Sequence, residues 1–258
     1  MLKLSIVKIG GAVIEDPVKL ASFLADFAAL EGHKILVHGG GKKASLWAEK
    51  LGIPVHIKDG RRVTDAATLE LITGIYGGQV NKNIVAILQG MNCNALGLSG
   101  ADGNALQAIK RPVKAIDYGF VGDISQVNTA LFSILLEQNI SPVCCAITHD
   151  GNGQLFNTNA DTIAAEIGKA MAAHFTTVLY YCFELPGVMK DINDPASLIE
   201  YITEESYTDL LVNNVISAGM LPKLYNAFDA LKGGVKEVGI GSSKMICNTT
   251  PYTSITLK

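Results

Sequence analysis

The fold is decided by residues 34–41, KILVHGGG, where a short apolar run leads into three consecutive glycines. The run has the length and composition of a buried strand, and helical spacing begins near Lys43. A glycine-rich turn from a strand into a helix presents backbone N–H groups to an anion. We therefore expect an anion-binding turn at the carboxyl end of this strand.

A second turn of this kind ends the apolar run 4–9, where the sequence reads Lys8-Ile9-Gly10-Gly11. Glycines let N–H groups approach an anion without a Cβ in the way, and Lys8 adds a full charge. Taken alone, the segment is more simply explained as a strand end with a solvated lysine. Two such turns carry more weight, because the carboxyl ends of parallel strands meet at one edge of a sheet, where ligands bind.

Short apolar runs alternate with segments of helical period, which predicts an α/β protein whose mostly parallel sheet has helices on both faces. The clearest strands span residues 4–9, 34–37, 141–146, 177–182 and 237–241. The clearest helix spans residues 17–30, with Pro17 suited to its first turn. Residues 106–127 differ, because turn formers such as Pro112 and Gly119 interrupt alternating apolar residues. This pattern indicates antiparallel strands that would cover a substrate.

The bulk composition is that of an ordinary globular protein, with 258 residues, 48% of them hydrophobic and 17% charged, and a net charge of −3. The positive charges form no stripe with interleaved aromatics, so we expect no nucleic-acid partner. No apolar stretch has the length needed to cross a bilayer, so we expect no membrane partner. Five cysteines without metal-ligand spacing, and Lys3 and Lys8 interrupting the N-terminal apolar run, favour a cytoplasmic protein with free thiols.

The common fingerprints of other sites are missing from the sequence. Neither glycine turn matches the P-loop pattern, and no G-x-G-x-x-G occurs, so phosphate binding must be built in another way. The five histidines show no paired spacing, and no G-x-S-x-G marks a nucleophilic serine. Zinc and serine hydrolase functions are therefore disfavoured.

Two later segments add polar groups at helix starts. Asn157-Thr158-Asn159-Ala160-Asp161 leads into a helix over 162–171, and Gly219-Met220-Leu221-Pro222-Lys223 opens a helix that ends near residue 231. A lysine in a first turn is disfavoured by the helix dipole, so Lys223 indicates an anionic partner or a tolerated surface charge. Asp161 is equally well explained as a simple N-cap and the two asparagines as turn formers.

Taken in order, five segments resemble the amino acid kinase family over nearly the whole chain. They are residues 8–11 (KIGG), 38–41 (HGGG), 60–64 (GRRVT), 157–161 (NTNAD) and 219–223 (GMLPK). The resemblance implies a three-layer αβα sandwich with a mostly parallel central sheet and two lobes. By the same resemblance, residues 1–175 bind an acyl amino acid and dimerise, and residues 176–258 bind ATP.

The activity implied by this resemblance is transfer of the γ-phosphoryl group of ATP to the γ-carboxylate of N-acetyl-L-glutamate, a step of arginine biosynthesis, with Mg²⁺ carried by the nucleotide. The same chemistry on N-succinyl-L-glutamate is the nearest alternative. Kinases of aspartate, carbamate, uridylate and glutamate share the fold, although segments 38–41 and 157–161 favour the acylglutamate branch. A sensor of the same fold without turnover is a further alternative, of another class.

The resemblance also implies roles for individual residues. The catalytic group would be Lys8, Lys223 and Asp161, in which the aspartate orients both lysines on the transferred phosphoryl group. The substrate would be held by Gly39, Gly40, Arg62, Asn157 and Asn159, with Arg62 on its α-carboxylate. The phosphoryl group would receive N–H groups from Gly10, Gly11 and Gly41. Such a site requires no general base, because a carboxylate is already ionised at neutral pH.

One segment departs from the family pattern Thr-Asp-Val-x-Gly-Val. This chain has CFELPGV at residues 182–188, where Glu184 replaces an aspartate and lengthens the side chain. The implied nucleotide contacts are Glu184, Leu185, Gly187, Val188, Val215, Ile216 and Ser217. The sequence also begins with its first strand, without the N-terminal helix of arginine-inhibited hexameric relatives, so a homodimer without arginine feedback is expected.

Overall fold

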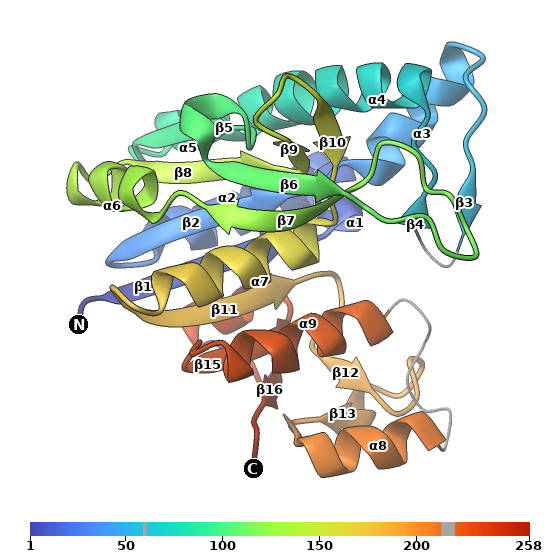
Figure 1. Ribbon diagram of the computed structural model, residues 1–258. Coiled ribbons are helices and arrows are strands. Elements are labelled where there is room, and N and C mark those ends of the chain that lie inside the picture. Colours follow the sequence, from blue (N-terminus) through green and yellow to red (C-terminus); the bar gives the residue numbers. More distant parts are fainter. Residues whose placement is uncertain (59–60, 213–219) are drawn as a thin grey trace.

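A central sheet of eight strands runs through the molecule in the computed structural model, which describes residues 1–58, 61–212 and 220–258 (Figure 1). In spatial order the strands are β14 (Tyr201–Ile202), β16 (Thr253–Ile255), β15 (Glu237–Gly241), β11 (Thr176–Cys182), β1 (Lys3–Ile9), β2 (His33–His38), β8 (Ser141–Cys145) and β5 (Ala95–Leu98). Neighbouring strands are parallel except β15 and β16. The predicted mostly parallel sheet is confirmed.

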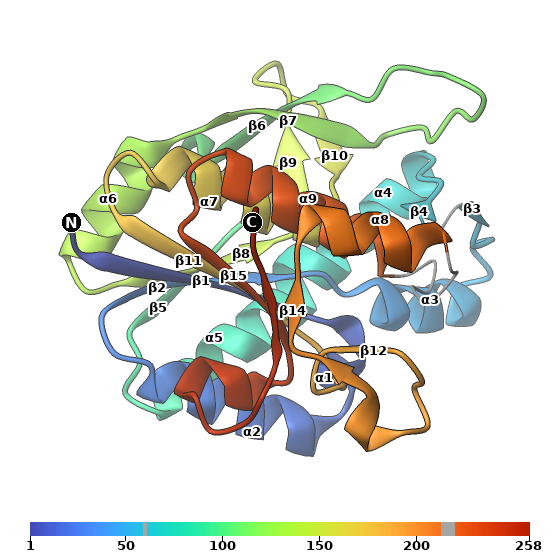
Figure 2. The ribbon, with the colours of Figure 1, turned by 90° about the horizontal axis from the view of Figure 1, so that it is seen from below.

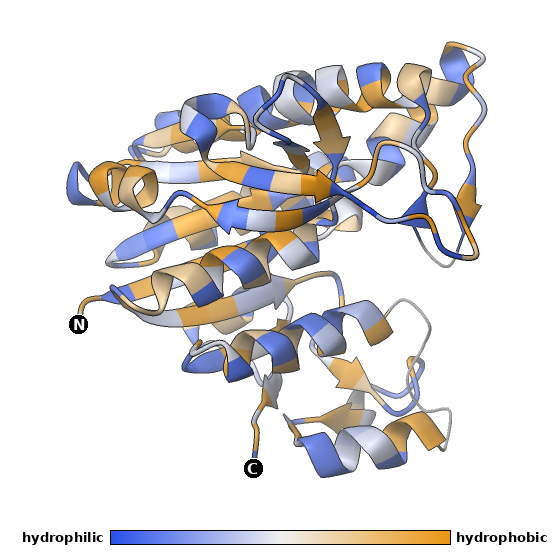
Figure 3. Ribbon diagram, in the orientation of Figure 1, coloured by the Kyte–Doolittle hydropathy of each residue, from blue (hydrophilic) through white to orange (hydrophobic). Residues whose placement is uncertain are grey.

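Helices cover both faces of this sheet, which completes the three layers expected from the sequence. Figure 2 shows α6 (Thr129–Glu137), α7 (Ala160–Met171) and α9 (Leu221–Lys232) on one face, and α2 (Pro17–Ala29) and α5 (Asn81–Gly90) on the other. Polar and apolar residues alternate along α7 and α9, as expected of helices with one face on a sheet (Figure 3). Among the described residues, no helix is both long and apolar enough to cross a membrane.

The start of α2 illustrates how local sequence fixes an element. The Asp16 carboxylate caps the helix by accepting hydrogen bonds from the N–H groups of Val18 and Lys19, at 3.0 and 3.1 Å. Pro17 occupies the first helical position, where its missing N–H costs nothing. Four apolar side chains at helical spacing are then buried, namely Leu20, Phe23, Leu24 and Phe27. The predicted helix 17–30 is therefore confirmed to within one residue.

A smaller sheet of four strands lies next to α7 (Figure 1). Its order is β10 (Leu155–Asn157), β9 (Ile147–His149), β6 (Leu106–Lys110) and β7 (Gly122–Val127). β6 and β7 are antiparallel with an irregular register between Gln107 and Ala108, which confirms the antiparallel strands predicted within residues 106–127. β10 leads directly into α7, so the small sheet ends where the predicted polar segment begins.

One unbroken helical run covers the β5 side of the molecule. It comprises α4 (Ala66–Thr73), the π-helical turn η1 (Gly74–Val80) and α5. A π-helical turn inside such a run is rare and is often found at functional sites. This one places Tyr76 against the glycine turn that follows β2.

The remaining elements are short. They are α1 (Gly11–Glu15), α3 (Gly41–Lys50), β3 (Ile57–Lys58), β4 (Arg61–Arg62), η2 (Asp102–Asn104), β12 (Val188–Met189), η3 (Pro195–Ser197), β13 (Leu198–Ile199), α8 (Glu204–Val212) and η4 (Ser243–Cys247). α1 and α3 start directly at the two glycine turns, so the passage from strand through glycine to helix, expected for residues 38–41, is observed at both turns.

The carboxyl ends of four central strands meet at one edge of the sheet. Ile9 pairs with both His38 and Cys182, and His38 pairs with Cys145, so the segments that follow these residues lie side by side. The expected lobe boundary, between residues 175 and 176, lies directly before β11 in the sequence. Because β11 pairs with β1, one continuous sheet extends across this boundary.

Candidate active site

Two lysines from distant parts of the chain converge on one buried carboxylate. Lys8, near the end of β1, has its Nζ 2.7 Å from Asp161 Oδ1. Lys223, in the first turn of α9, donates from its Nζ to Asp161 Oδ2 at 2.9 Å. Lys8 and Asp161 are only 8% and 4% exposed. The expected meeting of the two ammonium groups is therefore present in the structure.

Asp161 is free to bind both lysines because another residue caps its helix. The side-chain oxygen of Asn159 accepts hydrogen bonds from the N–H groups of Asp161 and Thr162, at 2.8 and 3.1 Å. Asn159 is thus the N-cap of α7, and the interpretation of Asp161 as the cap is wrong. Both carboxylate oxygens of Asp161 point to lysines instead.

Burial and charge act in opposite directions on this cluster. Burial acts to raise the pKa of Asp161, but the ammonium groups of Lys8 and Lys223 outweigh it and hold that pKa at about 2. Burial lowers the pKa of Lys8, Asp161 opposes this, and the like charge of Lys223 adds to the lowering. Asp161 therefore remains ionised at neutral pH and compensates two close positive charges.

The two glycine turns offer N–H groups unequally. The Gly10 N–H donates to Cys182 O at 2.8 Å, so this group is engaged in the sheet and is not offered to a phosphoryl group in this structure. The N–H groups of Gly11, Gly40 and Gly41 have no acceptor within the described part of the chain. The free N–H groups of the two turns therefore come from Gly11 and from the turn after β2.

Close approach explains why Gly40 is a glycine. A Cβ at Gly40 would lie 2.8 Å from Cδ1 of Tyr76, a distance that real Cβ contacts do not reach. Tyr76 itself is buried, and it is held in the π-helical turn η1. The aromatic ring therefore supports the turn from one side and leaves the other side open.

A cavity of about 350 Å³ lies along the turn after β2 and along the segment that enters α7. It is lined by residues 39–42, by residues 157–160 and by residues outside these two segments, including Ser45, Arg62, Tyr76 and Arg111. Ala160, which precedes Asp161, is one of the lining residues, so the cavity adjoins the lysine and aspartate cluster. Its size suits a small anionic molecule.

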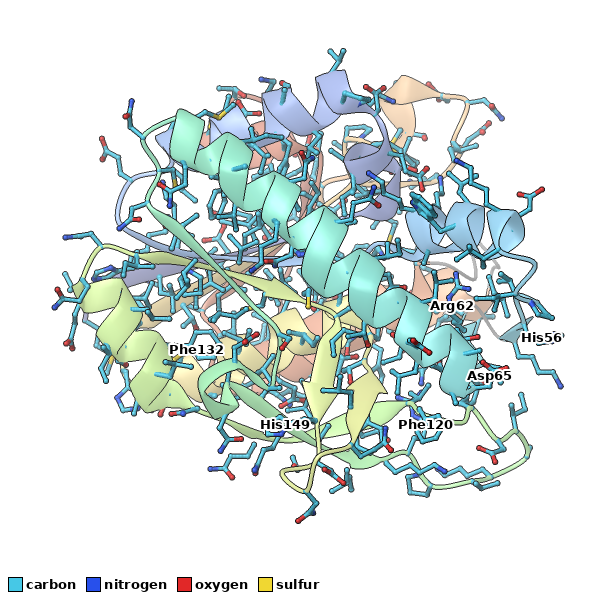
Figure 4. The ribbon with its side chains drawn as sticks, turned by 90° about the horizontal axis from the view of Figure 1, so that it is seen from above. His56, Arg62, Asp65, Phe120, Phe132 and His149 are labelled. Atoms are coloured by element: carbon cyan, nitrogen blue, oxygen red, sulfur yellow. The ribbon has the colours of Figure 1, made fainter. Side chains whose placement is uncertain are left out.

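Arg62 is held rigidly at the wall of this cavity. Its Nη2 donates to Gly41 O at 2.9 Å and to Ser45 Oγ at 2.6 Å. Its Nη1 is buried and has no partner among the residues that the structure describes. Figure 4 shows Arg62 beside the Asp65 end of α4, with Phe120 on the same side of the molecule. A guanidinium fixed on one edge and unpaired on the other is suited to bind a carboxylate.

The two asparagines of the predicted site have different surroundings. Asn157 donates from its Nδ2 to Thr64 Oγ1 at 3.0 Å, which ties the end of β10 to the chain just after Arg62. Asn159 uses its side-chain oxygen as the helix cap, so only its NH₂ group is left for a ligand. Both residues line the cavity, as do Gly39 and Gly40.

The predicted nucleotide segment lies beyond β11, on the other side of Lys8. Glu184 is exposed and Leu185 is half-buried. Gly187 and Val188 are buried, and Thr253 Oγ1 accepts a hydrogen bond from the Val188 N–H at 2.8 Å, so these two residues have packing roles. The other predicted contacts, Val215, Ile216 and Ser217, lie outside the described residues, as do Gly60 and Gly219 of the quoted segments.

Four further residues of the site were not predicted from the sequence. Ser45 accepts a hydrogen bond from Arg62, and Tyr76 packs against Gly40. Thr64 accepts a hydrogen bond from Asn157. Arg111 lines the cavity, and its Nε donates to Asp123 Oδ1 at 3.0 Å. Only Thr64 lay inside a recognised segment. Ser45 and Tyr76 lie on helices and Arg111 follows β6, and the contacts of all three depend on how distant elements pack.

Comparisons with known proteins show what this chain is similar to. The model of the amino acid kinase family matches residues 3–242. The acetylglutamate kinase of Phocaeicola vulgatus is 51% identical over 238 residues, which cover 92% of this chain and 93% of that protein. The acetylglutamate kinase of Cytophaga hutchinsonii is 52% identical over 239 residues, covering 92% and 90%. The crystal structure of smu.665 from Streptococcus mutans superimposes with a TM-score of 0.81 at 25% identity, covering 99% of both chains.

Proposed function

The chain belongs to the amino acid kinase family, and from this premise we propose that it transfers the γ-phosphoryl group of ATP to the γ-carboxylate of N-acetyl-L-glutamate. The products are an acyl phosphate and ADP. Relatives named acetylglutamate kinase, about half identical over more than nine-tenths of the chain, support this substrate. The observation that carries the proposal is the convergence of Lys8 and Lys223 on Asp161 beside an anion-sized cavity.

The reaction needs positive charge more than it needs proton transfer. A γ-carboxylate oxygen attacks the γ-phosphorus, and the bond from that phosphorus to the bridging oxygen of ADP breaks. The attacking carboxylate is ionised at neutral pH, so no base is required. The transferred group spreads negative charge over three equatorial oxygens, and it passes between two anions. Fixed cations are therefore the main catalytic requirement.

We assign that role to Lys8 and Lys223, with Asp161 as the residue that positions both. The Asp161 carboxylate holds each Nζ within 3 Å before substrate arrives, so the charges need no reorganisation during transfer. Gly11 and Gly41 supply N–H groups that lack acceptors in the described structure. Gly10 then has a packing role, since a Cβ there would lie 3.3 Å from Cys182 O.

The acceptor occupies the cavity in this proposal. Arg62 binds the α-carboxylate through the guanidinium edge that is unpaired in the described structure. Asn157 and the NH₂ group of Asn159 hold the acyl amide, and Gly39 and Gly40 line the same wall. The γ-carboxylate is thereby directed past Ala160 to the lysine pair.

ATP is assigned to residues 176–258 and the acceptor to residues 1–175. β11 and β2 flank β1, and the segment after β11 begins on the side of β1 away from the cavity turn, which supports Glu184 and Leu185 as nucleotide contacts. Mg²⁺ is proposed to enter on the nucleotide phosphates. This is supported by the engagement of both Asp161 oxygens with lysines, which already compensate the charge of that carboxylate.

The pathway, the cellular compartment and the oligomeric state are also part of the proposal. We place the reaction in arginine biosynthesis and in the cytoplasm, where a reducing environment suits the free and buried thiols of Cys93, Cys144, Cys145 and Cys182. A homodimer is expected from the family resemblance, and light scattering of the purified protein is the direct test.

One observation favours a second candidate acceptor, N-succinyl-L-glutamate. The cavity wall carries Arg61 and Arg111 in addition to Arg62. A succinyl group ends in a third carboxylate, which would need such an extra donor. Arg111 is already paired with Asp123, so Arg61 is the better candidate.

Trapping the product as a hydroxamate distinguishes these functions. The protein is incubated with ATP, Mg²⁺ and hydroxylamine, with N-acetylglutamate, N-succinylglutamate, glutamate and aspartate offered in parallel. Hydroxamate with N-acetylglutamate supports the proposal, and a higher kcat/KM with N-succinylglutamate supports the second candidate. Hydroxamate with none of the four would contradict both and favour a sensor.

A further inference from the structure

His38 is a buried polar residue that the reaction itself leaves unused. It ends β2, immediately before the glycine turn, and is 0% exposed. Its Nδ1 lies 2.7 Å from Gly39 O, and its Nε2 lies 3.0 Å from Nδ2 of Asn81 at the start of α5. Both ring nitrogens therefore have partners.

The neighbours of Asn81 fix the direction of these contacts. Asn81 Nδ2 also lies 2.8 Å from Val143 O, which is only an acceptor, and Asn81 Oδ1 lies 3.2 Å from Lys82 Nζ, which is only a donor. The amide NH₂ group must therefore face His38 and donate to Nε2. The imidazole proton is then on Nδ1, which donates to Gly39 O.

Two further features surround this assignment. A Cβ at Gly97 of β5 would lie 1.9 Å from Asn81 Oδ1, so the glycine makes room for the Asn81 amide. Burial lowers the pKa of His38 to about 4, in agreement with a neutral ring that both donates and accepts.

The bond to Gly39 O has a geometric consequence. In a trans peptide, the C=O of one residue and the N–H of the next point in opposite directions. The Gly39 carbonyl faces the imidazole, so the Gly40 N–H faces away from it. Gly40 lines the cavity, and its N–H has no acceptor among the described residues.

We propose that His38, held in one tautomer by Asn81, is a positioning residue that fixes the peptide between Gly39 and Gly40 and thereby aims the Gly40 N–H at the anionic acceptor in the cavity. The inference rests on the proposed function for the identity of that acceptor. It adds a chain of contacts that runs from β8 and α5 through the imidazole to the substrate.

Matched substitutions of His38 test the proposal. The amide nitrogen of an asparagine matches Nδ1 of histidine, whereas that of a glutamine matches Nε2. His38→Gln is expected to lower kcat/KM for N-acetylglutamate on the order of 10- to 100-fold with little change in the KM for ATP. His38→Asn should recover most of that loss. His33→Gln, at the other end of β2, is the control and should leave kinetics unchanged.

The outcomes that overturn the proposal are distinct from a failure of folding. Equal losses in His38→Asn and His38→Gln, or an equal rise in both KM values, would indicate a packing role only. ¹⁵N NMR of the wild-type protein gives a second measurement, in which the neutral ring should carry its proton on Nδ1. A proton on Nε2 would contradict the proposal even if no variant folds. Wild-type protein inactive with every acceptor would contradict the proposed function, but not the tautomer.

Discussion

The Lys223 ammonium group lies 2.9 Å from the Asp161 carboxylate, although 62 residues separate them in the chain. The contact joins the first turn of α9 to the first turn of α7. A lysine in a first helical turn faces the positive end of the helix dipole, an arrangement that is unfavourable without a neighbouring anion. Asp161 supplies that anion in the structure, and the transferred phosphoryl group supplies a second one in the proposed reaction.

Asp161→Asn should lower both stability and turnover. The substitution keeps the shape of the side chain but leaves Lys8 as a buried charge without its counter-ion. Breaking a buried ion pair in this way costs about 3–5 kcal/mol. Urea denaturation measures the loss in the free energy of unfolding. Lys8→Met combined with Asp161→Asn should recover part of that stability but none of the activity. A single variant as stable as the wild type would contradict the buried ion-pair cluster.

Arg62→Lys should weaken acceptor binding selectively. A lysine lacks the planar fork, so it would lose the bonds to Gly41 O and Ser45 Oγ together with the unpaired edge that binds the acceptor in the proposed site. We expect the KM for N-acetylglutamate to rise on the order of 10- to 100-fold, which is the value of a hydrogen bond to a charged group. The KM for ATP is the internal control, and a parallel rise in both constants would argue against a role in acceptor binding.

Gly40→Ala should damage the glycine turn through Tyr76. The added Cβ would lie 2.8 Å from the buried ring, and relief requires movement of the turn or of η1. Overpacking of this kind costs about 1–3 kcal/mol. Thermal unfolding and acceptor kinetics should both be affected. Gly78→Ala is the matched control, since its Cβ would meet no atom within 4 Å, and it should be neutral in both measurements.

Acidification should destabilise the protein through His38. The pKa of this residue is about 4 in the folded protein and near 6.5 when unfolded, so the unfolded chain binds the extra proton between these values. The free energy of unfolding should therefore fall as the pH drops from about 6.5 to about 4, on the order of 3 kcal/mol in total. Asp161 titrates below this window. His38→Asn should flatten the dependence, and an unchanged slope in that variant would exclude His38 as its source.

Much of the fold could be predicted from the sequence. The strand predicted at 237–241 has those bounds in the structure, and the strand at 177–182 begins one residue earlier. These runs are buried on both faces of a parallel sheet, so their composition alone identifies them. Lys8 and Lys223 could be assigned to one place because both belonged to family segments, while nothing in their local sequence indicated the contact.

The rest depended on contacts between distant elements. Asp161 and Asn159 are both residue types that cap helices well, so the local sequence does not say which of them caps α7. In the structure Asn159 is the cap, and the Asp161 carboxylate contacts the lysines. The Gly10 N–H donates to Cys182 O because β11 is the neighbour of β1 in the sheet. These two residues are far apart in the sequence, so the contact could not be predicted from it. Tyr76 reaches Gly40 from a π-helical turn that no local pattern revealed.

Single-turnover phosphoryl transfer in Lys223→Met tests the central claim most directly. Lys232→Met is its matched control, because Lys232 lies on the same helix and pairs with Glu204 on the surface. With ATP, Mg²⁺ and saturating N-acetylglutamate, we expect the transfer rate of Lys223→Met to fall on the order of 100-fold or more, with Lys232→Met close to the wild type. A rate within a few-fold of the wild type in Lys223→Met would contradict the assignment of the lysine pair to the transferred phosphoryl group.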